Sequence, residues 1–241
     1  MPVRRRLDES LVARGFYASR SRARDAILRG TVHVNGALAA KPAQMVAQDA
    51  AIIIADAAQA YVSRAALKLK HALAHFGLSP EARNALDIGA STGGFTQVLL
   101  EQGAQHVTAI DAGHGQMMLE DPRLTLIEGL NARDLGPQHL SWPIDFIVCD
   151  VSFISLKLAL PPALDLAERG AHLVALIKPQ FEAGRDALGK GGLVTDATEH
   201  TRVCAEIAEF LRNKGWTALG LVPSPLIGGG GNTEFLIAAR K

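Results

Sequence analysis

Acidic and basic side chains flank several apolar runs that have the composition of buried strands. Asp150 comes directly after "FIVC", Lys178 directly after "VALI", and Glu234 directly before "FLIAA". If these runs belong to one parallel sheet, Asp150 and Lys178 lie at the same edge, where ligands bind in such folds. A neutral amine there can act as a general base. Glu234 needs a nearby cation, because a carboxylate among apolar residues is costly to bury unpaired.

A lysine at the end of a strand is more often a solvated cap than a catalytic group. Pro179 ends the strand at once and fixes Lys178 beside the expected site, which favours the catalytic interpretation. The two cysteines are different. Cys149 precedes Asp150 on the same strand and should point to the opposite face. Cys204 lies in an amphipathic segment, so we expect both thiols to be core residues.

A glycine-rich loop, "LDIGASTGGFTQVLL", follows one expected strand and opens a helix. It departs from the dinucleotide pattern G-x-G-x-x-G because position 91 is serine. Asp111 ends the next strand, 22 residues after Gly89, where an acid can bind ribose hydroxyls. Asp87 is unfavourable beside a pyrophosphate but suits an ammonium or sulfonium ligand, so S-adenosylmethionine is favoured over NAD and over an ordinary glycine-rich turn. The expected cofactor-binding residues are Asp87, Gly89, Ser91, Gly93, Gly94, Phe95, Asp111 and Asp150.

Short aliphatic runs alternate with helical patterns over residues 60–241. This alternation is typical of a mostly parallel, doubly wound α/β sheet. The last two runs could form an added antiparallel hairpin at the edge. The expected strands are "NALDIG", "HVTAID", "LTLIEG", "IDFIVCD", "HLVALIKP", "TALGLVPSP" and "TEFLIAAR".

Residues 1–59 have a different character and are expected to form a small separate α+β domain. Residues 1–60 hold nine Lys and Arg against five Asp and Glu, whereas residues 61–241 hold sixteen against nineteen. A basic segment on a mildly acidic one suggests that the N-terminus binds a polyanion. We expect a helix over "RRRLDESLVARGF", a helix over "SRSRARDAILRG" capped by Ser19 or Ser21, a hairpin at Asn35-Gly36, a strand in "MVAQDAAIIIA" and a linker at residues 56–60.

The stretch "RLDESLVARGFYASRSRARDAILRGTVHVNG" resembles the S4 RNA-binding domain. The resemblance covers about the first sixty residues and implies structured RNA as the ligand, held through phosphate contacts from arginines. A merely solvated charged face is the competing interpretation. The arginines expected to contact RNA are Arg4, Arg6, Arg20, Arg22, Arg24 and Arg64.

Five further motifs, in chain order, resemble the FtsJ-type methyltransferases: "YVSRAALKL", "DIGASTGGFT", "CDVSFISL", "LIKPQFE" and "GGGNTEFL". Preceded by an S4 domain, they resemble the TlyA family, ribosomal-RNA 2′-O-methyltransferases that act on cytidine and were historically labelled haemolysins. The resemblance implies a Lys-Asp-Lys-Glu catalytic tetrad. The matching positions are Lys68, Asp150, Lys178 and Glu234.

This resemblance implies different roles for the two lysines of "AYVSRAALKLKHALAHFG". On a helix over residues 60–77, Lys68 and Lys70 flank the apolar face in directions about 160° apart, so by periodicity alone both could be solvated edge residues. The tetrad match assigns Lys68 to the pocket and leaves Lys70 as an ordinary flank charge. Arg64 would lie one turn before Lys68 and guide RNA.

The resemblance implies an S-adenosylmethionine-dependent transfer of a methyl group to a ribose 2′-hydroxyl of ribosomal RNA, with Lys178 as the base. A membrane-active cytolysin and an RNA-binding protein with an inactive methylase fold are the alternatives. We find no signal peptide, no membrane-spanning run and no metal-ligand cluster, and two distant cysteines indicate a reducing compartment. We therefore expect a soluble, cytoplasmic protein. The oligomeric state and the target nucleotide cannot be derived from the sequence.

Overall fold

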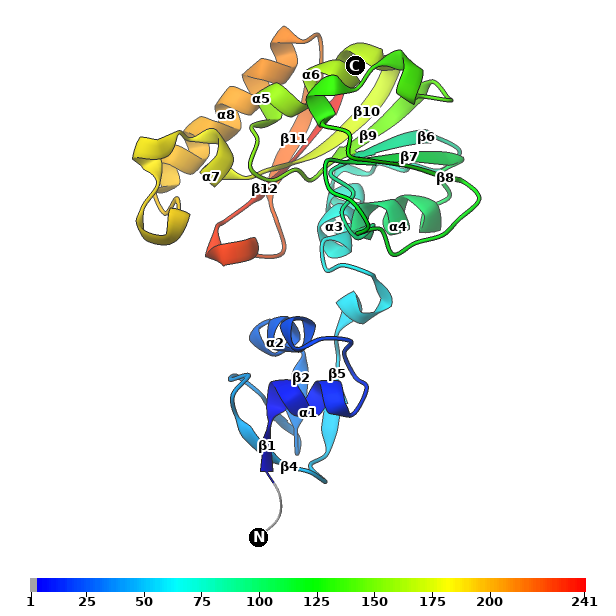
Figure 1. Ribbon diagram of the computed structural model, residues 1–241. Coiled ribbons are helices and arrows are strands. Elements are labelled where there is room, and N and C mark those ends of the chain that lie inside the picture. Colours follow the sequence, from blue (N-terminus) through cyan, green and yellow to red (C-terminus); the bar gives the residue numbers. More distant parts are fainter. Residues whose placement is uncertain (1–3) are drawn as a thin grey trace. The chain divides into compact units, whose positions relative to one another are not determined.

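The structure, a computed structural model, describes residues 4–241, with Gly229 described in its backbone alone. Its contacts divide the chain into an N-terminal unit, Met1–Ala60, and a C-terminal unit, Tyr61–Lys241. Figure 1 shows the two units as ribbons. Each unit has a hydrophobic core of its own.

The N-terminal unit packs two helices against short antiparallel strands. The helices are α1 (Leu7–Ala13) and α2 (Arg20–Leu28), and a three-stranded sheet has the order β3-β2-β5, with β2 Val32–Val34, β3 Ala37–Leu38 and β5 Ile52–Ile54. The side chain of Ser19 caps α2 by accepting from the backbone N–H of Arg22, as predicted. The expected hairpin is also present, with Asn35 and Gly36 both at positive φ between β2 and β3.

Two local expectations for this unit were wrong. Residues Arg4–Arg6 form a strand, β1, and not the start of the expected helix, because they pair with β4 (Met45–Ala47). The segment "MVAQDAAIIIA" is not one strand, since a turn after Ala47 sends β4 and β5 to separate sheets. Tertiary pairing overrode the local patterns in both cases. The expected linker at residues 56–60 contains the 3₁₀ helix η1 (Ala57–Ala60) and ends where the contacts divide the two units.

A seven-stranded sheet organises the C-terminal unit, in the order β11-β12-β10-β9-β6-β7-β8. Strands β10, β9, β6, β7 and β8 are parallel, whereas β12 is antiparallel to both β10 and β11. This confirms the predicted mixed α/β sheet with antiparallel strands at one end. The strands are β6 Asn84–Ile88, β7 His106–Asp111, β8 Leu124–Glu128, β9 Ile144–Cys149, β10 Ala167–Ile177, β11 Thr217–Pro223 and β12 Phe235–Arg240.

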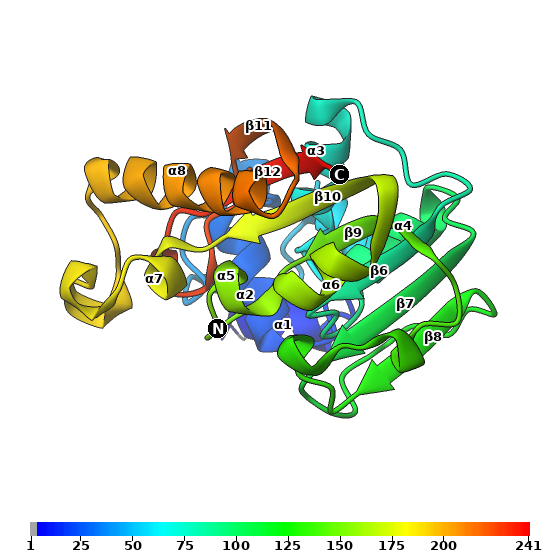
Figure 2. The ribbon, with the colours of Figure 1, turned by 90° about the horizontal axis from the view of Figure 1, so that it is seen from above.

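Helices cover both faces of this sheet because its strands are apolar on both sides. One face packs against α3 and α4, and the other packs against α5, α6 and α8 (Figure 1). Figure 2 shows α8 alongside the β11 and β12 end of the sheet. The α-helices are α3 Ala66–Phe76, α4 Gly94–Glu101, α5 Leu156–Ala159, α6 Pro161–Leu166, α7 Pro179–Glu182 and α8 Ala197–Asn213. Short 3₁₀ helices are η2 Ala132–Asp134, η3 Pro137–His139, η4 Arg185–Ala187, η5 Lys190–Gly192 and η6 Gly229–Gly231.

Helix α3 is shorter than the 60–77 segment that was expected to form it. It begins at Ala66, so Arg64 lies in the turn before the helix and not one helical turn below Lys68. Within the helix the prediction from periodicity holds. Leu69, Ala72 and Leu73 are buried against the sheet.

Candidate active site

Strand register brings the ends of four strands to one edge of the sheet. Ile88 is paired with Cys149, so Asp150 and the glycine loop leave neighbouring strands together. Ile177 is paired with Phe235 on the antiparallel β12, so Lys178 and Glu234 flank that pair at the same edge. The glycine loop, Asp150, Lys178 and Glu234 therefore converge although they come from distant parts of the chain.

Two ion pairs join the tetrad positions, one of them buried and the other partly buried. Lys68 Nζ lies 2.5 Å from Glu234 Oε2, and the two side chains are 7% and 3% exposed. Lys178 Nζ lies 2.6 Å from Asp150 Oδ1. Lys178 also donates a 2.8 Å hydrogen bond to the hydroxyl of Ser152. Lys70 is exposed and donates instead to the hydroxyl of Tyr61, which separates it from the pair formed by Lys68.

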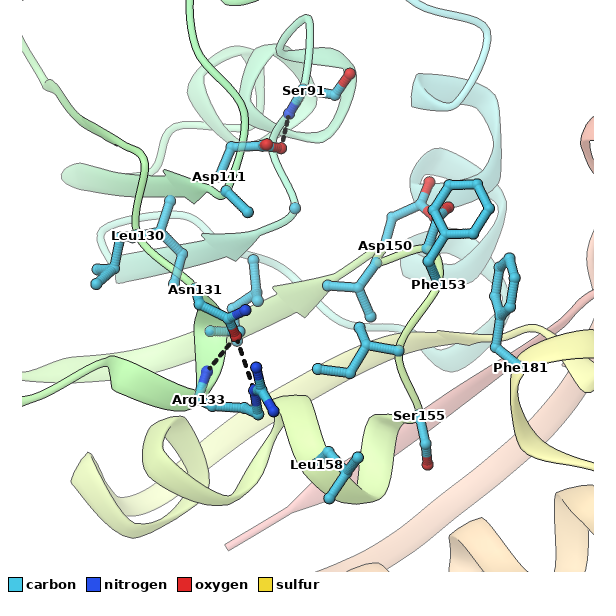
Figure 3. A pocket seen from close by; sticks show the side chains of 18 of the residues that line it. Ser91, Asp111, Leu130, Asn131, Arg133, Asp150, Phe153, Ser155, Leu158 and Phe181 are labelled. Carbon is cyan, nitrogen blue, oxygen red and sulfur yellow. Dashed lines mark hydrogen bonds between the residues drawn. The ribbon is translucent and has the colours of Figure 1, made fainter. Parts of the chain in front are cut away.

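A cavity of about 880 Å³ opens at this edge, and a smaller one of about 190 Å³ adjoins it. Both are lined by Gly89, Ser91, Asp150 and Ser152, and the smaller one also reaches Lys178. In Figure 3, Ser91 and Asp111 lie on one side of the larger cavity and Asp150 and Phe153 on the other. The larger volume is within the range of small-molecule and cofactor sites.

The glycine loop and Asp111 form a polar wall of the larger cavity. Asp111 accepts the backbone N–H groups of Ser91 and Gly113 at 2.8 and 2.7 Å, one on each oxygen. A carboxylate has about four acceptor positions, which leaves capacity for the two hydroxyls of a ribose. Gly89 has φ +82° and a Cβ there would lie 2.7 Å from the carbonyl oxygen of Asp150, so this close approach of loop and strand end requires glycine.

The other loop residues expected to bind cofactor have different surroundings. Gly93 and Gly94 form the N-terminus of α4, and Gly94 and Phe95 line the smaller cavity. Asp87 lies inside β6, is fully buried and accepts a 2.6 Å hydrogen bond from Thr96. It lines neither cavity. Burial raises the pKa of Asp87 to about 7, while the Thr96 hydrogen bond opposes that rise.

Both cysteines are buried, as predicted. Burial raises the pKa of the Cys149 thiol well above its usual range, and burial raises that of Cys204 to about 11. A thiol must ionise to act as a nucleophile or metal ligand. Their surroundings therefore fit core packing.

Several residues that line the larger cavity were missed by the sequence interpretation. Asn131 and Arg133 follow β8, and the Asn131 side chain accepts from the Arg133 backbone and guanidinium. Phe153 is 90% exposed and has φ +66°, and its ring lies against that of Phe181 in a tilted arrangement, with the ring centroids 5.2 Å apart (Figure 3). The signal for Phe153 was its place three residues after Asp150, since an exposed aromatic beside a polar site is typical of binding surfaces.

The arginines expected to contact RNA divide into three groups. Arg6 and Arg20 are both paired with the buried carboxylate of Asp8, at 3.0 and 3.2 Å. Chiefly the Arg6 hydrogen bond lowers the pKa of Asp8 to about 2. Arg4 and Arg24 are exposed. The third group, Arg22 and Arg64, is partly buried.

Comparison with known families gives two matches. Residues 61–241 match the FtsJ-like methyltransferase family, and residues 5–52 match the S4 domain. Among curated proteins, the chain is 42% identical to the "16S/23S rRNA (cytidine-2'-O)-methyltransferase TlyA" of Mycobacterium tuberculosis over 100% of this chain and 91% of that protein. It is 39% identical to "Hemolysin A" of Brachyspira hyodysenteriae, over 96% and 98% of the two chains.

Solved structures agree with these matches. A protein from Streptococcus thermophilus, whose printed name contains the word hemolysin, is 38% identical with a TM-score of 0.77 and covers 100% of this chain and 89% of its own. An S-adenosylmethionine-dependent methyltransferase from Mesorhizobium loti shares the fold at 14% identity and a TM-score of 0.52, over 71% of this chain and 96% of its own. Within residues 4–241, no helix is both long and apolar enough to cross a bilayer.

Proposed function

Because this chain belongs to the FtsJ-like methyltransferase family and, with its S4 domain, to the TlyA group, we propose that it methylates the ribose 2′-hydroxyl of a cytidine in ribosomal RNA. The observation that carries the proposal is that two ion pairs, the buried Lys68–Glu234 and the partly buried Lys178–Asp150, lie at the sheet edge where the glycine loop begins. The relative from Mycobacterium tuberculosis is named for this reaction on cytidine in 16S and 23S rRNA.

S-adenosylmethionine, when bound, supplies a methyl group on a positively charged sulfur. In our proposal Asp111 holds its ribose hydroxyls, and Gly89 and Ser91 let it approach the backbone of the loop. The larger cavity, with its carboxylate wall and its apolar residues Ile88, Ile110 and Leu130, fits a ligand that combines a charged end with an adenine ring.

Lys178 is the proposed base. A ribose hydroxyl is a weak nucleophile at neutral pH, and a positioned base is typically worth ~10²–10⁴-fold in rate. Lys178, as the neutral amine, would accept the hydroxyl proton while the oxygen bonds to the methyl group and the methyl–sulfur bond breaks, which would leave a neutral thioether; Asp150 orients the amine. Glu234 holds Lys68 at the same edge. Alignment of the reacting atoms supplies much of the remaining rate.

The exposed ring of Phe153 offers the target base a surface beside the reaction centre. Bases that are read individually in RNA are commonly unstacked and placed on aromatic side chains. Phe181 supports the ring of Phe153 from the side, and both line the larger cavity. This arrangement supports a single nucleotide, and not a duplex, as the group that enters the site.

Transfer of tritiated methyl from S-adenosylmethionine to ribosomal subunits tests the proposal. Subunits should come from a strain that lacks this gene, and the labelled atom should be identified after nuclease digestion. We expect label on a cytidine 2′-oxygen. Lys178→Ala should bind S-adenosylmethionine in calorimetry but lose at least ~10²-fold in transfer, whereas Lys157→Ala, at a surface ion pair, should retain activity.

Two results would contradict the proposal. Label on a base, or no label on either subunit, would remove the ribose 2′-hydroxyl as the acceptor. Near-normal transfer by Lys178→Ala would remove Lys178 as the base while leaving the reaction itself in place.

A further inference from the structure

Ser152 makes a contact that the tetrad does not explain. Its hydroxyl oxygen accepts a hydrogen bond from Lys178 Nζ at 2.8 Å, although Lys178 is only 8% exposed and Ser152 is itself exposed to solvent. Ser152 also lines both cavities. An exposed serine is not needed for packing, so its place beside the buried amine calls for another explanation.

The limited number of hydrogen-bonding positions on the Lys178 amine explains the contact with Ser152. A lysine ammonium has three N–H donors in a tetrahedral arrangement, and the neutral amine has two N–H groups and one lone pair. Among the described residues, Asp150 and Ser152 are the hydrogen-bond and ion-pair partners of Lys178. Ser152 takes one N–H, and the Asp150 carboxylate occupies a second direction around the amine at 2.6 Å, so a single direction is left for the lone pair.

We propose that Ser152 is a positioning residue that, together with Asp150, aims the lone pair of Lys178 at the ribose hydroxyl. The inference rests on the proposed function, since it concerns the same proton transfer. With Asp150 alone, the amine keeps its rotation about the Cε–Nζ bond. The second contact removes that freedom, and a misdirected lone pair is out of alignment with the acceptor proton.

The chemistry of a hydroxyl suits this position. A second carboxylate in place of Ser152 would favour the charged ammonium and oppose proton uptake, whereas a neutral oxygen orients the amine without adding charge. The segment that carries Ser152 is also fixed at both ends. The Asp150 N–H donates to the carbonyl of Ile88 at 3.0 Å, and Ser155 donates to Glu182.

Three variants test the inference in the full-length protein with ribosomal subunits as substrate. Ser152→Ala should lower kcat about tenfold or more, as expected when a reacting group is misaligned, with KM for S-adenosylmethionine and for subunits within about twofold of wild type. Ser152→Thr keeps the hydroxyl and should restore most of kcat. Ser141→Ala, at an exposed serine that lines neither cavity, should match wild type.

Each other result overturns the inference. An unchanged kcat in Ser152→Ala means that Ser152 does not orient the base. A raised KM for subunits with unchanged kcat means that Ser152 contacts RNA instead. Equal losses in the alanine and threonine variants with a lowered melting temperature mean a structural role. If wild type itself transfers no methyl group to RNA, it is the proposed function that fails, and this outcome is distinct from the others.

Discussion

Among single residues, Lys68 and Lys70 show how position separates two identical side chains. They are two residues apart on α3, yet Lys68 is 6% exposed and paired with Glu234, whereas Lys70 is exposed. Removing one partner of a buried ion pair leaves an unpaired charge and typically costs ~3–5 kcal/mol. We predict that Lys68→Met lowers both the melting temperature and the rate of methyl transfer. Lys70→Met should change the melting temperature by no more than a few degrees and the rate of methyl transfer by no more than twofold.

A double variant separates the structural from the catalytic contribution of Lys68. In Lys68→Met with Glu234→Leu, the apolar pair should recover most of the stability, because buried ion pairs can often be replaced by hydrophobic residues. Methyl transfer should stay lost. Thermal unfolding and the tritium assay measure the two properties, and recovery of both together would show that the pair acts only on folding.

Burial of Asp87 should make the stability of the protein depend on pH. Its folded-state pKa is about 7, against 3.8 as the ordinary value. The folded protein therefore binds more protons than the unfolded chain between about pH 4 and 7, and the free energy of unfolding falls as pH rises through that window. The full effect is on the order of 4 kcal/mol.

The variant Asp87→Asn should not show this loss. We expect its melting temperature to match that of wild type near pH 4 and to exceed it at pH 8, where wild-type Asp87 ionises without a paired cation. Scanning calorimetry at both pH values checks this. A constant difference between the two proteins across the range would mean that Asp87 is not titrating in the core.

We predict that Phe153 contributes to the binding of RNA and not to the binding of S-adenosylmethionine. Loss of one base-stacking aromatic costs about 1–3 kcal/mol. Phe153→Ala should therefore weaken productive binding of subunits by roughly 5- to 150-fold, with calorimetric affinity for S-adenosylmethionine unchanged. Phe153→Tyr keeps a ring and should stay near wild type. Equal losses in both variants would point to the positive φ of this residue as the sensitive feature.

The proposed active site is assembled by the pairing of strands from distant parts of the chain. Strand β12 runs antiparallel between β10 and β11, so its first residues, and not its last, reach the edge where the parallel strands end. That reversal brings Glu234 beside the ends of β9 and β10. The loop before β12 then packs on the carboxylate. A Cβ on Gly228 would lie 2.2 Å from Glu234 Oε1.

Gly228→Ala is therefore predicted to displace the Glu234 carboxylate from Lys68. Because the added methyl group would overlap the carboxylate, methyl transfer should fall by an order of magnitude or more while binding of S-adenosylmethionine persists. Gly184→Ala is the control. Gly184 has φ +85°, but a Cβ added there would have no atom within 4 Å. It should cost about 1 kcal/mol of stability and leave transfer intact. Normal transfer by Gly228→Ala would contradict this account of the loop.

At the scale of the whole molecule, charge is divided between the two units. Nine cationic against five anionic side chains lie in residues 1–60, and sixteen against nineteen lie in residues 61–241. Affinity for RNA that comes from phosphate contacts depends on salt, because binding releases counterions. The N-terminal unit should therefore carry most of the salt dependence of subunit binding.

Arg24→Ala tests this division. Arg24 is exposed on α2, so its loss should lower affinity for subunits and reduce the slope of log affinity against log salt by about 1, without a change in melting temperature. Arg212→Ala, at an exposed arginine at the end of α8, should leave the slope unchanged. Filter binding between 50 and 200 mM salt measures both, and equal slopes for Arg24→Ala and wild type would count against Arg24.

Much of the fold could be predicted from local pattern. All seven strands of the C-terminal sheet coincide with apolar runs, and the Ser19 cap and the Asn35-Gly36 turn are short-range signals. Where local and tertiary preferences competed, the sequence interpretation failed. The arginines of β1 have no strand pattern of their own, and they are extended because β4 pairs with them.

Most of the elements, the glycine loop and, through family resemblance, the candidate site residues can be predicted from the sequence. Which of these residues contact one another follows from the tertiary structure alone. Lys68 and Glu234 are 166 residues apart and are joined by the packing of α3 on a sheet whose strand order no local pattern encodes. The same packing took Asp87 out of the cavity and placed Ser152 on Lys178. The physical reason is that periodicity reports which face of an element is buried, whereas contacts between elements depend on register and strand order.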